Sequence, residues 1–276
     1  MFSRNYYCLV AGLREYALDA ETKGFDLKAI REEILEELSE ADAREVRLLY
    51  GYYDCENLIA AHDGRAVRNP LGCLTEEELR SALQDPEELP REVAEVIRAY
   101  RNPEGEEAET VDVSQRFGKN LMEAYYRACA HAGSRFMREW SLFDRTLRNI
   151  AAAVAARAAG RETEQSTVGG GDVVEQLHRS SAADFGLRGE LDWVDAVIAA
   201  VNDEPNLVEK EHKIDLIRWN GSSDIAAQDY FNINAVLAYL VRVNIVARWS
   251  LLDRERGRAM FDRLIAELDA KDLINK

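Results

Sequence analysis

The chain is poor in helix breakers and in the residue patterns of metal or disulfide frameworks. Only five of its 276 residues are proline, and segments that alternate as half-buried strands are nearly absent. The four cysteines are widely separated with no Cys-x-x-Cys pair, and the four histidines form no His-x-x-x-His pair. We therefore predict no zinc site, no disulfide framework and no cofactor, and we interpret the cysteines as reduced thiols.

Long apolar runs are also missing. No segment approaches the roughly 20 apolar residues that cross a bilayer, and the opening residues lack the cleavage pattern of a secretory leader. Acidic residues outnumber basic ones by 51 to 35, which gives a formal net charge of −16. Because such a charge disfavours a general electrostatic grip on nucleic acid or an anionic membrane, we expect a cytoplasmic protein that binds no nucleic acid and inserts nothing into a membrane.

Helical periodicity dominates what is present. Glu, Arg, Leu and Ala are abundant, and a hydrophobic fraction of 47% is sufficient for a core. Apolar residues recur at helical spacing over residues 27–38, and Ser39 and Thr75 each begin a capping-box pattern with an acidic residue three positions later. The predicted fold class is all-α, an elongated multi-helix bundle with internally repeated long helices.

Changes in this pattern divide the chain into four regions. An N-terminal helical region covers residues 1–110, and a long helical spine follows over residues 111–161, with a possible interruption at residues 132–134. A Gly-rich linker spans residues 162–171, and a C-terminal helical region covers residues 172–276. We expect these regions to form one continuous helical architecture.

Two polar segments are predicted to interrupt the helices. The run that ends in three glycines at residues 169–171 is expected to be a flexible connection, since a phosphate-cradling loop would need a following Gly-Lys-Ser/Thr that is absent. Residues 220–223, Asn-Gly-Ser-Ser, are expected to break the next helix. The last helical tract then runs from about Ala226 to Leu268, and its apolar residues face more than one direction, which predicts a position deep in the bundle.

One hexapeptide occurs in two similar copies. Residues 140–145 read Trp-Ser-Leu-Phe-Asp-Arg and residues 249–254 read Trp-Ser-Leu-Leu-Asp-Arg. In each copy the tryptophan and the aspartate are four residues apart and share a helix face. We interpret the pair as an internal repeat in which a long helix recurs, with a chance match as the alternative.

A catalytic interpretation of the copies is weak. Asp144 and Asp253 would form a carboxylate pair, but an arginine follows each one and no His, Cys or activated nucleophile is near. We expect Asp144 and Arg148, at i and i+4, to form an exposed ion pair. Trp140 and Trp249 are interpreted as core anchors, with interface anchors as the alternative.

Asp54, Asn57 and Leu58 lie at i, i+3 and i+4 on one face of a predicted helix. Leu58 can enter the core, while the Asn57 amide, with two donors and an acceptor, can satisfy backbone groups of an adjacent turn. We predict that the three residues form a structural joint. The alternative is that Asp54 and Asn57 face a partner subunit.

Motifs at both ends of the chain carry a family resemblance. They are Tyr-Tyr-Cys-Leu-Val-Ala-Gly-Leu at residues 6–13, Asp-Cys-Glu-Asn-Leu at residues 54–58, and a C-terminal segment that includes Tyr239 and Trp249. Together they resemble an uncharacterised bacterial family encoded beside V/A-type ATPases, itself similar to the C/d subunit that couples the rotor of these enzymes to the membrane ring. Residues 62–64, His-Asp-Gly, depart from the C/d pattern, which tends to carry a basic residue there.

The resemblance implies an all-helical, non-catalytic protein without a cofactor. It implies a coupling or assembly subunit of a proton- or sodium-translocating V/A-type ATPase, whose partners are the ATPase subunits of the central stalk or membrane ring and can hold it at the inner membrane. One alternative is a stand-alone helical scaffold or regulator with another partner. Another is an enzyme with a cryptic site, although no acid, base and nucleophile can be assembled from the motifs.

Overall fold

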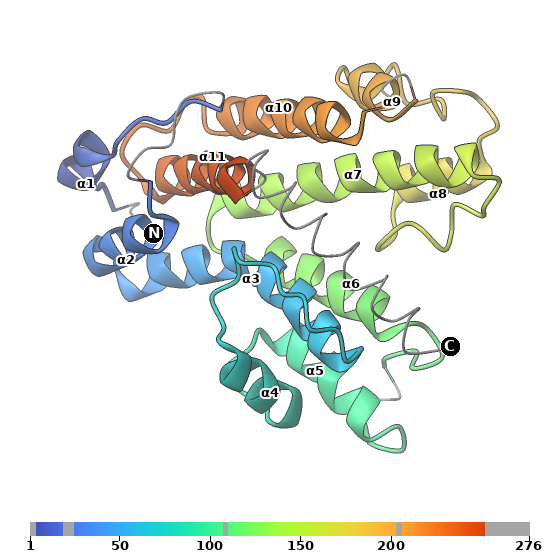
Figure 1. Cartoon of the computed structure of the whole chain (residues 1–276), viewed down its shortest axis with the longest axis horizontal. Coiled ribbons are helices and arrows are strands. Elements are labelled where there is room, and N and C mark those ends of the chain that lie inside the picture. The colour runs from blue at the N-terminus through green and yellow to red at the C-terminus, as the bar shows by residue number, and fades with distance from the viewer. Residues whose placement is uncertain (1–3, 19–24, 107–109, 203–205, 252–276) are drawn as a thin grey trace, which may run out of the picture.

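The computed structural model describes residues 4–18, 25–106, 110–202 and 206–251. Every regular element in these ranges is a helix and none is a strand, which confirms the all-α class (Figure 1). The helices are α1 (Tyr7–Gly12), α2 (Leu27–Glu37), α3 (Glu40–His62), α4 (Glu76–Gln84), α5 (Arg91–Arg101), α6 (Phe117–Ala130), α7 (Arg135–Ala158), α8 (Asp172–Arg179), α9 (Val194–Asn202), α10 (Leu207–Ile225) and α11 (Ile233–Leu251).

The predicted helix caps form locally. The Ser39 side chain accepts a hydrogen bond from the N–H of Asp42 and starts α3. Thr75 and Glu78 bond each other's backbone N–H groups in a complete capping box at the start of α4. Each cap satisfies N–H groups that have no partner inside the helix, so these starts are fixed by nearby sequence.

The predicted spine is two helices, and a third helix fixes the turn between them. The carboxylate of Glu45, on α3, accepts hydrogen bonds from the backbone N–H of Gly133 at 2.8 Å and of Ser134 at 3.1 Å. The Ser134 hydroxyl donates to the same carboxylate at 2.7 Å and also caps α7. A side chain from residue 45 thus sets where a helix at residue 135 begins.

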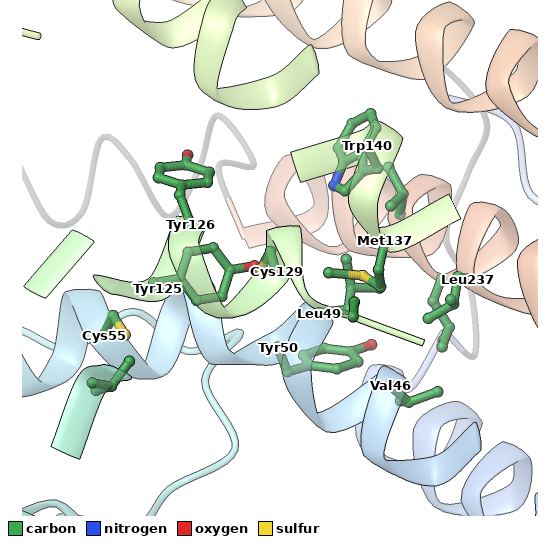
Figure 2. Packing of buried hydrophobic residues seen from close by; sticks show 14 of the residues in the cluster. Val46, Leu49, Tyr50, Cys55, Tyr125, Tyr126, Cys129, Met137, Trp140 and Leu237 are labelled. Carbon is green, nitrogen blue, oxygen red and sulfur yellow. The ribbon is translucent and has the colours of Figure 1, made fainter. Parts of the chain in front are cut away.

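Two hydrophobic clusters pack along α7. The larger one unites α2, α3, α5, α6, the first half of α7 and α11, so the N-terminal and C-terminal regions share a core. Figure 2 shows Leu49 and Tyr50 of α3 near Met137 of α7 and Leu237 of α11. The smaller cluster joins the second half of α7 to α8 and α9 around Phe185. Burial of apolar surface in both clusters holds the helices together.

The Gly-rich segment is packed against α7 and is not the free connection that its glycines suggest. The Asn149 amide accepts the N–H of Val168 at 2.8 Å and donates to its carbonyl at 2.9 Å. Thr167 is almost fully buried. The Asn149 side chain thus supplies the hydrogen-bond partners of both the N–H and the carbonyl of Val168, and it holds this loop residue much as a neighbouring strand would.

The expected break at residues 220–223 is wrong, because α10 continues to Ile225. Gly221 faces α7 at a close approach, and a Cβ there would overlap the ring of Phe143. The glycine therefore makes room for a neighbouring helix and does not end its own. The last helix consequently begins at Ile233 and not near Ala226, and the part of the predicted tract beyond Leu251 lies outside the described residues. None of the described helices combines the length and the apolar character needed to cross a membrane.

We predict that Gly221→Ala destabilises the protein. Overpacking against a ring costs about 1–3 kcal/mol, which exceeds the roughly 1 kcal/mol that alanine gains over glycine in a helix. Thermal unfolding should show a lower Tm, and adding Phe143→Leu should restore part of the loss. Gly12→Ala is the matched control, because a Cβ at Gly12 would meet no atom within 4 Å. A Gly221→Ala variant as stable as the parent would contradict the close approach.

Candidate functional site

Charged side chains meet where α7, α10 and α11 come together. Helix α10 supplies three of them at i, i+4 and i+7, which places them along one face. We call the group the interhelical network, and its members are Asp144, Arg148, Glu211, Asp215, Arg218, Arg248 and Trp249.

Asp144 is the buried acceptor on α7. Its Oδ1 accepts from Nε of Arg218 at 2.7 Å and its Oδ2 from Nε of Arg148 at 2.7 Å. Asp144 pairs with Arg148 as expected, but its side chain is only 6% exposed, so the expectation that the pair is exposed is wrong. Helix α10 packs over this face and adds a second arginine, Arg218. Burial opposes ionisation, but the two guanidinium groups outweigh it and hold the pKa of Asp144 below its usual range.

Asp215 is the corresponding acceptor on α10, and its side chain is fully buried. Its Oδ1 accepts from Nη1 of Arg218 at 3.0 Å, while its Oδ2 accepts from Arg248 at 2.5 Å and from the indole N–H of Trp249 at 2.9 Å. Arg248 also pairs with Glu211. Each buried carboxylate therefore has at least two charged or polar donors, as a buried charge requires.

Aromatic rings surround the arginines of the network. The Arg148 guanidinium carbon lies 4.3 Å from the ring centroid of Tyr52, and that of Arg218 lies 5.6 Å from the ring centroid of Trp140. Burial raises the pKa of Tyr52 and of Tyr53. The rings of Tyr52 and Trp140 present π faces that attract the cations, so the guanidinium groups are oriented as well as neutralised.

The two predicted tryptophan copies have different surroundings. Trp140 is buried and stacks on Phe136 with ring centroids 6.1 Å apart. Trp249 is half-buried, bonds Asp215 and makes an edge contact with His212 at 5.2 Å. The similar local packing expected of a repeat is not found. Both residues nevertheless touch α10 in the network, and Asp253 lies outside the described residues.

The predicted joint is a clamp on the loop after α3. Oδ1 of Asp54 accepts the backbone N–H of Cys73 at 2.7 Å and of Leu74 at 2.9 Å. The Asn57 amide exchanges two bonds with the backbone of Asn69, at 2.6 Å to its N–H and 3.0 Å to its carbonyl, and Leu58 is fully buried. The Asn57 geometry is the one predicted from its donors and acceptor.

Glycine is required where the clamp closes. A Cβ at Gly72 would overlap Nδ2 of Asn57 and lie 2.9 Å from Oδ1 of Asp54. Burial raises the pKa of Asp54, although the two N–H groups that it accepts oppose the rise. The loop backbone thus approaches α3 closely enough to replace water around both polar side chains.

The clamped loop and five members of the network, all except Asp144 and Trp249, line one cleft of about 760 Å³. Tyr52, Asn57 and their neighbours on α3 contribute to it, as do Arg68 of the loop, Arg148 of α7 and Arg248 of α11. Tyr239 lies elsewhere, and its hydroxyl donates to the carbonyl of Arg14 at 2.9 Å, which ties the N-terminal segment to α11. In the part of the chain that the structure describes, no three His, Cys, Asp or Glu side chains gather as a metal site would require.

Four members of the network did not emerge from the sequence: Glu211, Asp215, Arg218 and Arg248. A signal was present, because the first three follow helical spacing, i, i+4 and i+7, and form a charged stripe. A charged stripe ordinarily marks a solvated face. Only the opposing Asp144 shows that this one is buried.

Asn57→Leu should lower the free energy of unfolding by about 1–3 kcal/mol, because it leaves the N–H and carbonyl of Asn69 without their partners. Urea denaturation measures the change. Asn220→Leu, at an exposed position of α10, is the control and should have little effect. If Asn57→Leu melts like the parent but loses its binding partner, the residue belongs to an interface.

Asp144→Asn should lower the free energy of unfolding by about 3 kcal/mol at pH 7, because Arg218 and Arg148 keep their charge and lose their counterion. The control is Asp195→Asn, which breaks a fully exposed pair with Arg188 and should change little.

The same substitution has a pH signature. The pKa of Asp144 in the folded protein lies below its unfolded value of about 3.9. The stability that the ionised carboxylate contributes is therefore complete above the unfolded pKa and is lost as pH falls through the folded pKa. Urea denaturation from pH 7 to pH 3 should therefore show the parent and Asp144→Asn converging in acid. A constant difference would contradict the assignment of the ionised carboxylate.

Comparison with known proteins gives a family and no curated relative. No protein of curated function matches the chain. A family model described as a protein of unknown function, DUF2764, matches residues 3–271. The match covers nearly the whole length and includes every described helix, so the chain belongs to the DUF2764 family.

Proposed function

We propose that this protein is a non-catalytic coupling or assembly subunit of a V/A-type proton- or sodium-translocating rotary ATPase. The resemblance of residues 6–13, residues 54–58 and the Tyr239–Trp249 segment to proteins encoded beside these ATPases supports the proposal. The all-helical fold is compatible with it.

The observation that carries the proposal is how the charged groups in and beside the 760 Å³ cleft are used. Asp144 and Asp215 are engaged in joining α7, α10 and α11 to one another. A general acid or base needs a pKa near the working pH, whereas pairing moves the pKa of Asp144 downward and that of Arg148 upward. These groups are suited to holding helices in fixed relation, which is what a subunit that transmits force needs.

The ion pairs connect three helices through directional bonds. Arg218 bonds Asp144 on α7 and Asp215 on its own helix, and Arg248 brings α11 to the same carboxylate. Hydrophobic packing alone lets helices slide, because it has little directional preference. Charge-assisted hydrogen bonds fix both distance and orientation. In the proposed role, force applied to one helix passes to the others without a change in their register.

A stand-alone helical scaffold or regulator is the second candidate. It would use the same rigid frame and differ only in its partner. In either role we expect a cytoplasmic protein, and in the first role ATPase partners would hold it at the inner membrane.

Co-purification tests the proposal. The affinity-tagged full chain, expressed in its own cells, should recover the subunits of the V/A-type ATPase from gently solubilised membranes. The tag alone is the control. Recovery of the chain without these subunits, from cells that contain the assembled ATPase, would contradict the proposal and favour the scaffold. The isolated chain should hydrolyse no nucleotide and contain no stoichiometric transition metal.

A further inference from the structure

The cleft is locally positive in a strongly acidic chain. Among the described residues, its lining has five arginines and three carboxylates. Asp144 and Asp63 lie outside the lining and pair with lining arginines, and counting them as well gives five charges of each sign. The whole chain carries a formal charge of −16. A surface of this sign attracts a negatively charged group that the rest of the molecule repels. The lining charges are Arg65, Arg68, Arg148, Arg218, Arg248, Glu56, Glu211 and Asp215.

Arg148 has unused hydrogen-bonding capacity toward this cleft. It bonds Asp144 through Nε, and its terminal nitrogens donate no hydrogen bond to the part of the chain that the structure describes. About a third of its side chain is exposed, and its guanidinium carbon lies 4.3 Å from the ring centroid of Tyr52. A planar guanidinium with two free terminal nitrogens matches the two oxygens of a carboxylate.

Apolar side chains accompany the arginines. Val67, on the clamped loop, is 74% exposed, and Leu251, at the end of α11, is 42% exposed. Both line the cleft, with Ile59, Met122 and Ile214 among the other apolar residues. Exposed aliphatic groups beside arginines are typical of protein interfaces, where arginine is enriched and an apolar core is ringed by polar groups.

The lining selects against a highly charged small anion. A triphosphate would bring about four negative charges to a site whose own carboxylates, Glu211 and Asp215, already occupy much of the arginine charge. It would also leave the aliphatic side chains exposed. An amphipathic segment that presents single carboxylates between aliphatic residues satisfies both kinds of lining.

We propose that this cleft binds an acidic, aliphatic-rich helix of a partner subunit, with a carboxylate on Arg148 and aliphatic side chains on Val67 and Leu251. The inference rests on the proposed function for the identity of the partner complex. It rests on the lining of the cleft for the chemistry of the bound segment. In this proposal the clamp by Asp54 and Asn57 holds the loop that carries Val67 in the position needed for binding.

Site-specific photo-crosslinking tests the proposal in the full chain. A photoreactive amino acid replaces Val67 in cells, and the attached peptide is sequenced by mass spectrometry. The control position is Val208, an exposed valine on α10 that does not line the cleft. We expect position 67, and not position 208, to attach to an acidic helical segment of an ATPase subunit. Attachment to a basic segment, to residues 252–276 of the same chain, or to nothing would overturn the proposal, and so would displacement of the acidic segment by free ATP.

Charge reversal gives an independent readout. Arg65→Glu adds negative charge at the cleft and should reduce crosslinking from position 67 by about tenfold or more. Arg80→Glu is the matched control, since both arginines are exposed and each pairs with one carboxylate, but Arg80 lies on α4 outside the cleft. Unchanged crosslinking in Arg65→Glu would overturn the proposal.

The two hypotheses fail in different ways. Co-purification with the ATPase without a crosslink from position 67 would keep the proposed function and remove the cleft as its docking site. A crosslink to an acidic helix of a protein outside the ATPase would keep the chemistry of the cleft and remove the ATPase role.

Discussion

The architecture depends on the burial of Asp144 between two arginines. A carboxylate with 6% exposure is tolerated only because Arg148 and Arg218 reach it at 2.7 Å from different helices. That requirement fixes α10 against α7, and Asp215 extends it to α11 through Arg248 and Trp249. Hydrophobic packing supplies the general attraction among these helices, whereas the ion pairs determine one relative position. A purely hydrophobic contact would be compatible with several relative positions of the helices.

The same group of helices carries both proposals. Arg218 and Arg248 bond carboxylates of the frame through their terminal nitrogens, whereas Arg148 bonds Asp144 through Nε, and the further proposal places a partner's carboxylate on its terminal nitrogens. In that proposal, one cluster both joins the helices and binds a partner. The loop clamped by Asp54 and Asn57 adds an apolar rim without a helix of its own, because side chains of α3 satisfy its backbone.

Local features were predictable from the sequence, and features set by distant residues were not. The all-α class, the caps at Ser39 and Thr75 and the bonding of Asn57 follow from spacing and side-chain chemistry. Gly221 looked like a breaker because its helix propensity is low, but its role depends on a ring of Phe143 from another helix. Asp144 was expected to be exposed because ion pairs between residues i and i+4 of a helix ordinarily lie on the surface. Its burial depends on Arg218, which is 74 residues away in the sequence.

The bond from Glu45 to the turn before α7 also bears on how the chain can be dissected. Its carboxylate supplies acceptors for two backbone N–H groups 88 and 89 residues further on. A fragment that starts after α3 would lack Glu45 and would leave these N–H groups before α7 without their acceptor. Both hydrophobic clusters pack along α7. The N-terminal third is therefore no detachable appendage, and the smallest autonomous unit of this protein must contain α3 and α7 together.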